Sequence, residues 1–551
     1  MNDLLYPAAA VDGVVSSKSG NRTSTTLAAY TGAWTKKQVV HLLKRTMFGA
    51  RRSDIDYFLT KTMSQAVDEL LTPGNAPSPP LNNYSNQYTD TVVAAGATWV
   101  NDFSTQPMAV SHRQQSIKAW WWNLMATQNR SAEQKMVLFW HNHLATQLSM
   151  YMRAEAGYKY LETLRQHAFG NFKQLMKAIT LDPAMLRFLN GDSNTKNAPD
   201  ENYGRELQEL FTVGKDLPNH FTEDDVKAAA RVLTGYRIDP STFTSYFDST
   251  KHDTTDKQFS AFYNNTLITG RTGAAGANEL DDLLTMIFAQ DEVAKYICRK
   301  IYRFFVYYDI DASVEANIIE PLAVVFRNSN YDIAATLSTL FKSEHFFDAL
   351  NYGCMIKSPV DFLVGLVREM EVALPGNTNL PLQYRTWMTA EYFCMTLSQD
   401  LLDPPSVSGW TEYYQYPQYH ELWINSSTLP FRNQVSDLLL YTGFSVSFNG
   451  GQFQLIIDVL AYAAGFSNPG DPVALIDDIV AHLYMIDVSQ SAKDYMRIYG
   501  LLGGQTSNTY WSTAWTDYIN NPTDAVKKNV VQTRLQYVLK YLMDSSEYQL
   551  S

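Results

Sequence analysis

Two histidines fall two residues apart in a segment that is otherwise apolar. His141 and His143 belong to the string Trp-His-Asn-His at residues 140–143. On a regular helix, side chains two residues apart point about 200° away from each other, so both rings cannot reach one metal ion. One of them could still act as an acid, a base or a single metal ligand, because histidine titrates near neutral pH. The alternative is a buried histidine that is hydrogen-bonded to backbone or to a carboxylate.

A second segment carries carboxylates, an amide and a guanidinium group. Four polar residues lie on the side of an expected helix opposite to an apolar stripe: Asn202, Arg205, Glu206 and Glu209. Arg205 can hold an anionic group with two hydrogen bonds, and Glu206 with Glu209 could flank a ligand or bind a divalent metal ion. The histidine that completes the di-iron pattern of helical bundles is absent here. The alternative is an exposed ladder of ion pairs, because Glu201, Arg205 and Glu209 are spaced four residues apart.

Two irregular stretches carry further candidate residues for ligand binding. His252 and Asp253 lie in a polar stretch at residues 236–275, where loops can project reactive groups from a rigid scaffold. The alternative there is a local turn that Asp253 caps. The second stretch, residues 402–431, is called the aromatic loop, and it concentrates six large rings: Trp410, Tyr413, Tyr414, Tyr416, Tyr419 and Trp423. Such rings can stack on sugars or on a protein partner, and the alternative is a loop that buries its own rings.

The elements that must position these residues are mostly helices. Capping boxes predict helix starts at Thr35, Ser131 and Thr222, and the Ser131 helix carries the two histidines. Helical periodicity dominates elsewhere, while residues 236–275 favour a small β-hairpin or an irregular excursion. We therefore expect a mainly α-helical fold of bundle-like subdomains, with one or two small irregular or β-hairpin excursions.

The predicted domain organisation has three parts. Residues 1–33 are rich in Ser, Thr, Ala and Gly, which predicts a flexible N-terminal tail. Residues 34–432 are expected to form a helical core domain with the candidate site, and residues 433–551 a C-terminal helical subdomain packed on that core. A chain of 551 residues is long enough for more than one hydrophobic core.

Composition argues against several classes of protein. The net charge is −12 and no run of Lys or Arg could follow phosphates, which argues against nucleic acid as a partner. The three cysteines are far apart and indicate neither a disulfide framework nor a thiolate zinc site. Serine-hydrolase elbows, phosphate-binding glycine-rich turns and zinc spacings are also absent. No transmembrane segment and no signal peptide are visible, so the default expectation is a cytoplasmic protein.

Five ordered motifs resemble those of a bacterial family, domain-of-unknown-function family 1800. They are, in chain order, His-Leu-Leu-Lys-Arg-Thr-Met-Phe-Gly at 41–49, Phe-Trp-His-Asn-His at 139–143, Glu-Asn-Tyr with Arg-Glu-Leu and Glu-Leu at 201–210, Leu-Thr-Gly-Tyr at 233–236, and Asp-Pro-Pro with Val and Gly-Trp at 403–410. The resemblance runs from Trp34 to Ser551. One departure is Asp200, which stands where asparagine is usual.

The resemblance implies a mostly α-helical protein without an established activity. Genes of this family often neighbour those of domain-of-unknown-function family 1501, which is similar to sulfatases and phosphatases and often bears a twin-arginine export signal. The resemblance therefore implies a sulfatase-like partner, and export, if any, in complex with that partner.

Two functional hypotheses from different classes follow. The first is a hydrolase-like or ligand-processing site in a polar cleft, with His141 or His143 as acid, base or ligand, and with a divalent metal ion as the candidate cofactor. Glu206 and Glu209 would supply its carboxylates. The second is a non-catalytic binding or scaffold protein that holds a carbohydrate or a protein partner with the aromatic loop.

Overall fold

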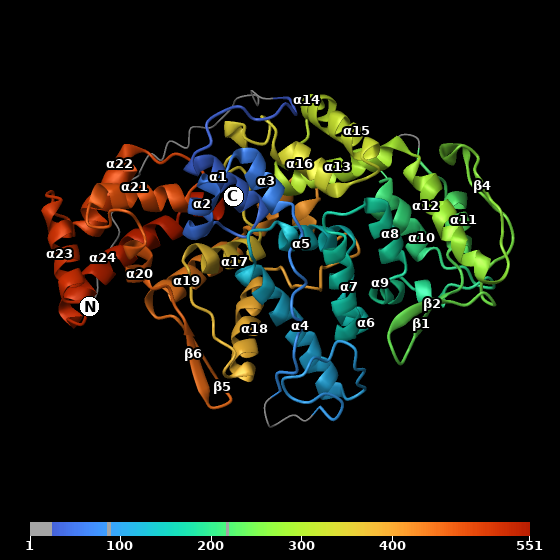
Figure 1. Ribbon diagram of the computed structural model, residues 1–551, viewed down its shortest axis with the longest axis horizontal. Helices are drawn as coiled ribbons and strands as arrows, with labels where there is room; N and C mark the ends of the chain where they lie inside the picture. The colour runs from blue at the N-terminus through green and yellow to red at the C-terminus, as the bar shows by residue number, and fades with distance from the viewer. Residues whose placement is uncertain (1–24, 85–89, 216–219) are drawn as a thin grey trace.

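The computed structural model describes residues 25–84, 90–215 and 220–551 (Figure 1). It is 56% helical, and the strands of these described residues form three two-stranded antiparallel sheets. The prediction of a mainly α-helical fold with small hairpins is confirmed. None of the helices within the described ranges combines the length and the apolar character that crossing a bilayer requires.

The first half of the chain is built from short and medium helices. Their bounds are α1 (Lys36–Thr46), α2 (Arg52–Leu59), α3 (Met63–Leu70), α4 (Pro107–Thr127), α5 (Glu133–His143), α6 (Leu148–Tyr151), α7 (Ala154–Gln166), α8 (Phe172–Thr180), α9 (Pro183–Phe188), α10 (Asn202–Glu206) and α11 (Glu223–Val232). The π-helical segment η2 (Leu207–Thr212) continues α10.

The second half of the chain is also built from short and medium helices. Its helices are α12 (Glu279–Phe288), α13 (Asp291–Phe305), α14 (Ala312–Val314), α15 (Glu320–Asn328), α16 (Ile333–Phe341), α17 (Pro359–Glu369), α18 (Leu380–Thr396), α19 (Thr428–Tyr441), α20 (Val459–Ala464), α21 (Pro472–Leu483), α22 (Gln490–Tyr495), α23 (Thr509–Asn520) and α24 (Ala525–Met543). Shorter 3-10 or π-helical turns are η1 (Gly191–Ser193), η3 (Ala261–Tyr263), η4 (Gly273–Asn278), η5 (Glu315–Ile319), η6 (Ala349–Asn351), η7 (Thr411–Tyr413), η8 (Tyr419–Trp423), η9 (Met496–Leu501) and η10 (Glu547–Gln549).

The strands pair only with their neighbours in sequence. The pairs are β1 (Tyr236–Asp239) with β2 (Thr244–Phe247), β3 (Lys257–Gln258) with β4 (Leu267–Ile268), and β5 (Phe444–Phe448) with β6 (Gly451–Leu455). Tyr236 faces Phe247 in the first register, and Phe444 faces Leu455 in the third. The first two hairpins occupy the 236–275 stretch in which the sequence predicted such an excursion.

Helix starts follow the local capping chemistry at two of the three predicted positions. Thr35 and Thr222 are the N-cap residues of α1 and α11, each in a capping box. The third prediction was wrong in position, because α5 begins at Glu133 after Ala132. The hydroxyl of Ser131 still accepts a hydrogen bond from the Glu133 N–H at 3.2 Å, so Ser131 caps the turn that leads into the helix.

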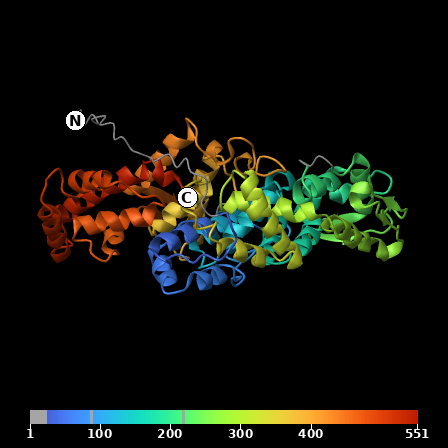
Figure 2. The ribbon, with the colours of Figure 1, turned by 90° about the horizontal axis from the view of Figure 1, so that it is seen from above.

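The core is centred on α4 and the helices around it. The side chains of Trp120, Trp121 and Trp122 are all buried, as expected for a helix with neighbours on every side. Helix α4 packs against α18, α17 and α7. In the elongated molecule of Figures 1 and 2, α20–α24 lie at one end and α8–α12 at the other.

The two ends of the described chain meet other parts of the molecule. A flexible tail was predicted for residues 1–33, of which residues 1–24 lie outside the described residues. In the described part, the Tyr30 N–H donates to the Lys342 carbonyl at 2.8 Å. Helix α1 contacts α21, and the Lys44 ammonium donates to the Leu483 carbonyl at 2.7 Å. The same ammonium forms a buried ion pair with Glu369 at 2.8 Å. N-terminal and C-terminal helices therefore share one buried polar contact.

Candidate functional site

A pocket of about 230 Å³ brings several of the candidate segments together. It lies between the end of α5, segment η2, helix α13 and the aromatic loop. The described residues that line it are Phe139, Asn142, His143, Glu209, Leu210, Lys215, Tyr296, Lys300, Arg303, Phe304, Ser408, Tyr413, Tyr414, Tyr416 and Tyr419. The structure thus unites His143 and Glu209 with Tyr413 and Tyr414, which the sequence had assigned to rival hypotheses.

His143 is held in the pocket wall as a neutral ring. Its Nε2 lies 3.0 Å from the Phe211 carbonyl. A carbonyl can only accept, so Nε2 carries the proton and Nδ1 is left as an acceptor. Burial, reinforced by the Lys300 charge, lowers the pKa of His143 to about 3. At neutral pH His143 therefore offers a hydrogen-bond acceptor and not a positive charge.

Segment η2 forms the wall next to the end of α5. The π-helical turn places Glu209 and Leu210 in the pocket. Carbonyls near the end of a helix have no N–H partner inside the helix. Here two of these carbonyls accept hydrogen bonds from side chains instead. The Tyr296 hydroxyl donates to the Leu210 carbonyl at 3.1 Å, and His143 donates to the next one. Gly214 follows with φ +85°, and a Cβ atom there would lie 2.7 Å from the Tyr296 ring.

The aromatic loop is fastened to the end of α5. The Asn142 side-chain oxygen accepts the Trp410 N–H at 2.8 Å. Gly409 has φ +84°, and a Cβ atom at this position would overlap the carbonyl and amide oxygens of Asn142. Only glycine fits such a close approach in this conformation. The Asn-His pair of α5 and the Gly-Trp pair of the loop are thus one structural unit.

The two tryptophans predicted as ligand-binding residues belong to the core. Trp410 and Trp423 are fully buried, and neither lines the pocket. The Trp410 ring packs edge-on against His141, with 5.5 Å between ring centroids. The alternative, a loop that buries its own rings, describes these two residues, whereas Tyr416 of the same loop is 80% exposed.

His141 lies behind the pocket wall. Its ring is fully buried, and Nδ1 donates to the Tyr160 oxygen at 3.1 Å, because the Tyr160 hydrogen is directed to the Leu144 carbonyl at 2.7 Å. Burial, with a smaller contribution from the Lys118 charge, lowers the pKa of His141 to about 3. This geometry fits the alternative of a structural histidine, and a catalytic role for His141 stays a prediction.

Arg205 is engaged by carboxylates on the outer side of α10. It pairs with Glu201 at 3.2 Å, with Glu209 at 3.6 Å and with Glu223 at 2.6 Å. The ion-pair ladder considered as the alternative is therefore formed. Asn202, Arg205 and Glu206 are not among the described residues that line the pocket. Burial, together with the Glu209 charge, raises the pKa of Glu206.

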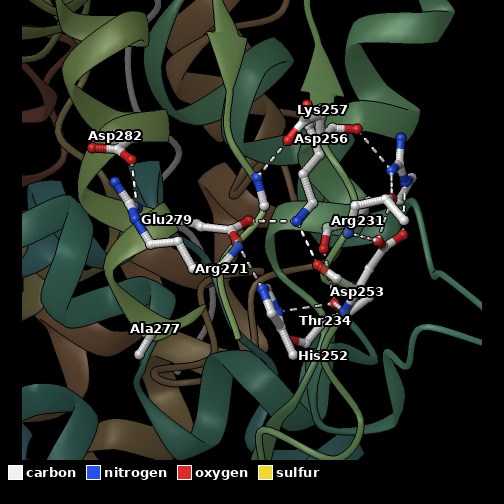
Figure 3. Close-up of polar contacts among 12 residues, drawn as sticks. Arg231, Thr234, His252, Asp253, Asp256, Lys257, Arg271, Ala277, Glu279 and Asp282 are labelled. Atoms are coloured by element: carbon white, nitrogen blue, oxygen red, sulfur yellow. Dashed lines mark hydrogen bonds and ion pairs between the residues drawn. The ribbon is translucent and has the colours of Figure 1, made fainter. Parts of the chain in front are cut away.

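His252 and Asp253 belong to a buried ionic cluster at the base of the hairpins (Figure 3). His252 Nδ1 donates to the Thr234 carbonyl at 2.9 Å, and its Nε2 lies 3.1 Å from the Glu279 carboxylate. The predicted alternative is seen at Asp253, which accepts the Thr255 N–H at 2.8 Å and pairs with Arg231. Although burial raises the pKa of Asp253, these contacts lower it to about 2. Neither residue lines the pocket.

The described residues provide no set of ligands for a metal ion. Within residues 25–84, 90–215 and 220–551, no group of three or more His, Cys, Asp or Glu side chains is placed to hold a metal ion. His143 and Glu209 are the two such residues in the described pocket lining. Helical metal centres use three or more ligands, and these two residues alone do not make such a set.

The basic side of the pocket was missed from the sequence. Tyr296, Lys300 and Arg303 project from α13, and Lys215 follows η2. The Lys300 ammonium lies over two rings, 5.2 Å from the centre of Tyr296 and 5.5 Å from that of Tyr414. The signal was the spacing i, i+4 and i+7, which places the three side chains on one face of an amphipathic helix.

Comparison with known families decides where the chain belongs. A family model described as "Protein of unknown function (DUF1800)" matches residues 41–550. The chain is a member of DUF1800. The resemblance inferred from the five motifs is thereby confirmed, and in this DUF1800 protein two of those motifs meet at the Asn142–Trp410 hydrogen bond. No curated protein and no solved structure matches the chain.

Proposed function

We propose that the pocket binds a small anionic sugar. The observation that carries this proposal is the convergence of Lys215, Lys300 and Arg303 with four tyrosines of the aromatic loop on one cavity. Cations hold a phosphate, sulfate or carboxylate group, and flat rings favour the faces of a sugar. The proposal joins the polar cleft and the aromatic loop, which the sequence presented as alternatives.

The charge balance of the described lining favours an anion. Glu209 is its one carboxylate, and Arg205 already lies 3.6 Å from that group on the outer side. Arg303 is oriented by a hydrogen bond from its Nε to the Tyr308 carbonyl at 3.3 Å and lies over the Tyr419 ring. A cluster of cations in a chain of net charge −12 focuses anions at this position.

Hydrolysis has less support than binding. A general base works best when its pKa lies near the working pH, and the pKa of His143 is about 3. His143 is therefore suited to accept a hydrogen bond from a sugar hydroxyl. A hydrolase-like activity stays a prediction, as does the sulfatase-like partner of family 1501, which co-expression and affinity purification of the two proteins would test.

Titration calorimetry with one sugar ring in four forms tests the proposal. Galacturonate, galactose 6-phosphate and galactose 6-sulfate carry an anion, and galactose is the neutral control. We expect binding of at least one anionic form, weakened by added salt, and little or none of galactose. The anionic form that binds identifies the group that the cations hold.

Variants on a single helix sharpen this test. Lys300→Gln and Arg303→Gln should each weaken binding on the order of tenfold, roughly 1.4 kcal/mol. Lys295→Gln is the matched control, because Lys295 lies on the same helix but pairs with Glu320 at 2.9 Å outside the pocket. The proposal is wrong if no anionic form binds, or if Lys295→Gln weakens binding as much as the two pocket variants.

A further inference from the structure

The pocket is too small for more than one sugar ring. Pockets for drug-sized ligands measure about 300–1,000 Å³, and this one measures about 230 Å³. A ligand of two or more rings must therefore leave the pocket across its rim. The side chain at that rim decides how such a ligand is held.

Tyr416 occupies the rim. It lines the pocket and is also the most exposed large apolar side chain of the described residues, at 80%. Single exposed apolar residues are common on protein surfaces and by themselves mean little. Tyr416 differs because its neighbour Tyr419 is buried, and their ring centroids lie 6.4 Å apart at 87°. The aromatic lining thus continues from the inside of the pocket onto open surface.

The geometry points to an oligosaccharide as the ligand, with its anionic terminal unit in the pocket and its second unit stacked on Tyr416. This inference rests on the proposed function, since it assumes that the pocket holds an anionic sugar. It adds the class of ligand, a chain of sugars recognised at its end, and it assigns Tyr416 as the residue that distinguishes a chain from a single unit. The residues that contact the terminal unit are those of the pocket.

The ratio of two affinities tests the inference. Galacturonate and trigalacturonate are titrated into the same protein at the same ionic strength. We expect the trimer to bind on the order of tenfold more tightly, because ring stacking contributes an affinity gain of that size. In Tyr416→Ala the ratio should fall towards one, and in Tyr416→Phe it should be retained, because the ring and not the hydroxyl makes the contact.

A control and a salt series separate stacking from charge. Tyr392→Ala removes another exposed tyrosine, 54% exposed on α18 and outside the pocket, and should leave the ratio unchanged. The extra carboxylates of the trimer add an electrostatic attraction that salt weakens, whereas the loss caused by Tyr416→Ala should persist at high salt. A ratio that is the same in Tyr416→Ala and in the unmodified protein overturns the inference.

The two proposals fail in different ways. If galacturonate binds and Lys300→Gln weakens it, but the trimer gains nothing, the pocket function stands and the inference about Tyr416 is wrong. If neither sugar nor any ester of galactose binds, the proposed function fails, and the inference fails with it. If the trimer alone binds and Tyr416→Ala does not affect it, the contact lies elsewhere and the inference is again overturned.

Discussion

Burial removes the charge from several histidines of this protein. The pKa is lowered by burial to about 3 in His141 and His143 and to about 4 in His420 and His482. The His482 ring shows the cause, since it donates to the Ala50 carbonyl at 2.7 Å and contacts the Tyr462 hydroxyl at 2.9 Å, with no route to water. These four histidines are therefore core residues that are uncharged at neutral pH.

Acid should therefore destabilise the fold. Unfolded histidines take up protons as the pH falls through about 6.5, while the folded rings stay neutral until about pH 4, so the unfolded state binds more protons in this window. Each such histidine lowers the free energy of unfolding by up to about 1.4 kcal/mol per pH unit. Asp182 and Glu391, whose pKa burial raises to about 7 and about 8, bind protons in the folded state in the same window and oppose the effect. Burial also lowers the pKa of His41, His112 and His167, which adds to the effect.

Urea unfolding at pH 7.5, 6.0 and 5.0 measures this effect. The free energy of unfolding should fall with pH, and the fall should be shallower in His482→Gln, which has no proton to gain. Equal slopes for the variant and the unmodified protein would contradict a neutral His482 in the folded state. Because the comparison is between slopes, a general loss of stability in the variant does not obscure it.

Gly409 is a second residue whose effect can be isolated. Gly409→Ala adds a Cβ atom against Asn142 in a backbone with φ +84°. Gly450→Ala is the matched control, because Gly450 has φ +72° and nothing within 4 Å of the added atom. The control should cost about 1 kcal/mol in the free energy of unfolding, from the left-handed backbone alone.

The clash with Asn142 should add about 1–3 kcal/mol more in Gly409→Ala and should weaken ligand binding, because the aromatic loop must shift. Chemical denaturation and calorimetry measure the two effects. Equal costs for the two substitutions would show that the loop is not clamped at Asn142.

At the scale of elements, the pocket depends on how η2 ends. The last turn is π-helical, and two of its carbonyls accept hydrogen bonds from Tyr296 of α13 and from His143 of α5. Two helices far apart in the sequence are therefore joined through the backbone of a third. The position of Glu209 follows from this junction together with its ion pair with Arg205 at 3.6 Å.

Tyr296→Phe should loosen this element. The substitution keeps the ring but removes the hydroxyl that donates to the Leu210 carbonyl, at a cost of about 1 kcal/mol. Hydrogen exchange should become faster at residues 209–215, and anionic ligands should bind more weakly. Tyr392→Phe, on the exposed surface of α18, serves as the control. Unchanged exchange at residues 209–215 would show that the hydroxyl does not stabilise the turn.

Local signals explain how much of these elements the sequence predicted. Thr35 and Thr222 marked helix starts correctly because a capping box is contained within four residues. The prediction from Ser131 was wrong by one residue, because the N-cap is Ala132 while the Ser131 hydroxyl accepts the Glu133 N–H. The pairing of Glu201, Arg205 and Glu209 was likewise visible as an alternative, since its spacing is local.

The site was predicted only in part, because it is assembled across long sequence distances. His143 and Tyr414 were named from the types of residues, but nothing local shows that α5 and the aromatic loop face each other. Lys300 and Arg303 were missed, because a cation on a helix is most often a solvated one. The contact that unites the site, Asn142 with Trp410, spans 268 residues.

At the scale of the whole molecule, buried charges link the first helix to the last third of the chain. Lys44 and Glu369 form an ion pair that is almost completely shielded from water. Glu371, two residues after Glu369, forms a second ion pair, with Arg52 at 2.9 Å, and its side chain is 41% exposed. One carboxylate therefore belongs to a buried pair and the other to a partly exposed one.

Glu369→Gln should lower the free energy of unfolding by about 3–5 kcal/mol, because it leaves the Lys44 ammonium buried without a counter-charge. Glu371→Gln should cost about 0–1 kcal/mol, as is usual for an exposed pair. Guanidinium unfolding of both variants measures the difference. Similar costs for the two would mean that water reaches Lys44.

The Lys44 contacts also set an order of events during synthesis. The carbonyl that Lys44 reaches belongs to Leu483, which is 439 residues further along the chain. At roughly 5–20 residues per second, a ribosome needs about 20–90 seconds to produce that partner after α1 has emerged. Throughout this interval the nascent N-terminal segment lacks the carbonyl that accepts the Lys44 hydrogen bond, and the part of α1 that packs on α21 stays uncovered. We expect it to be a substrate for chaperones that bind the growing chain, and the fold to close late and as a whole.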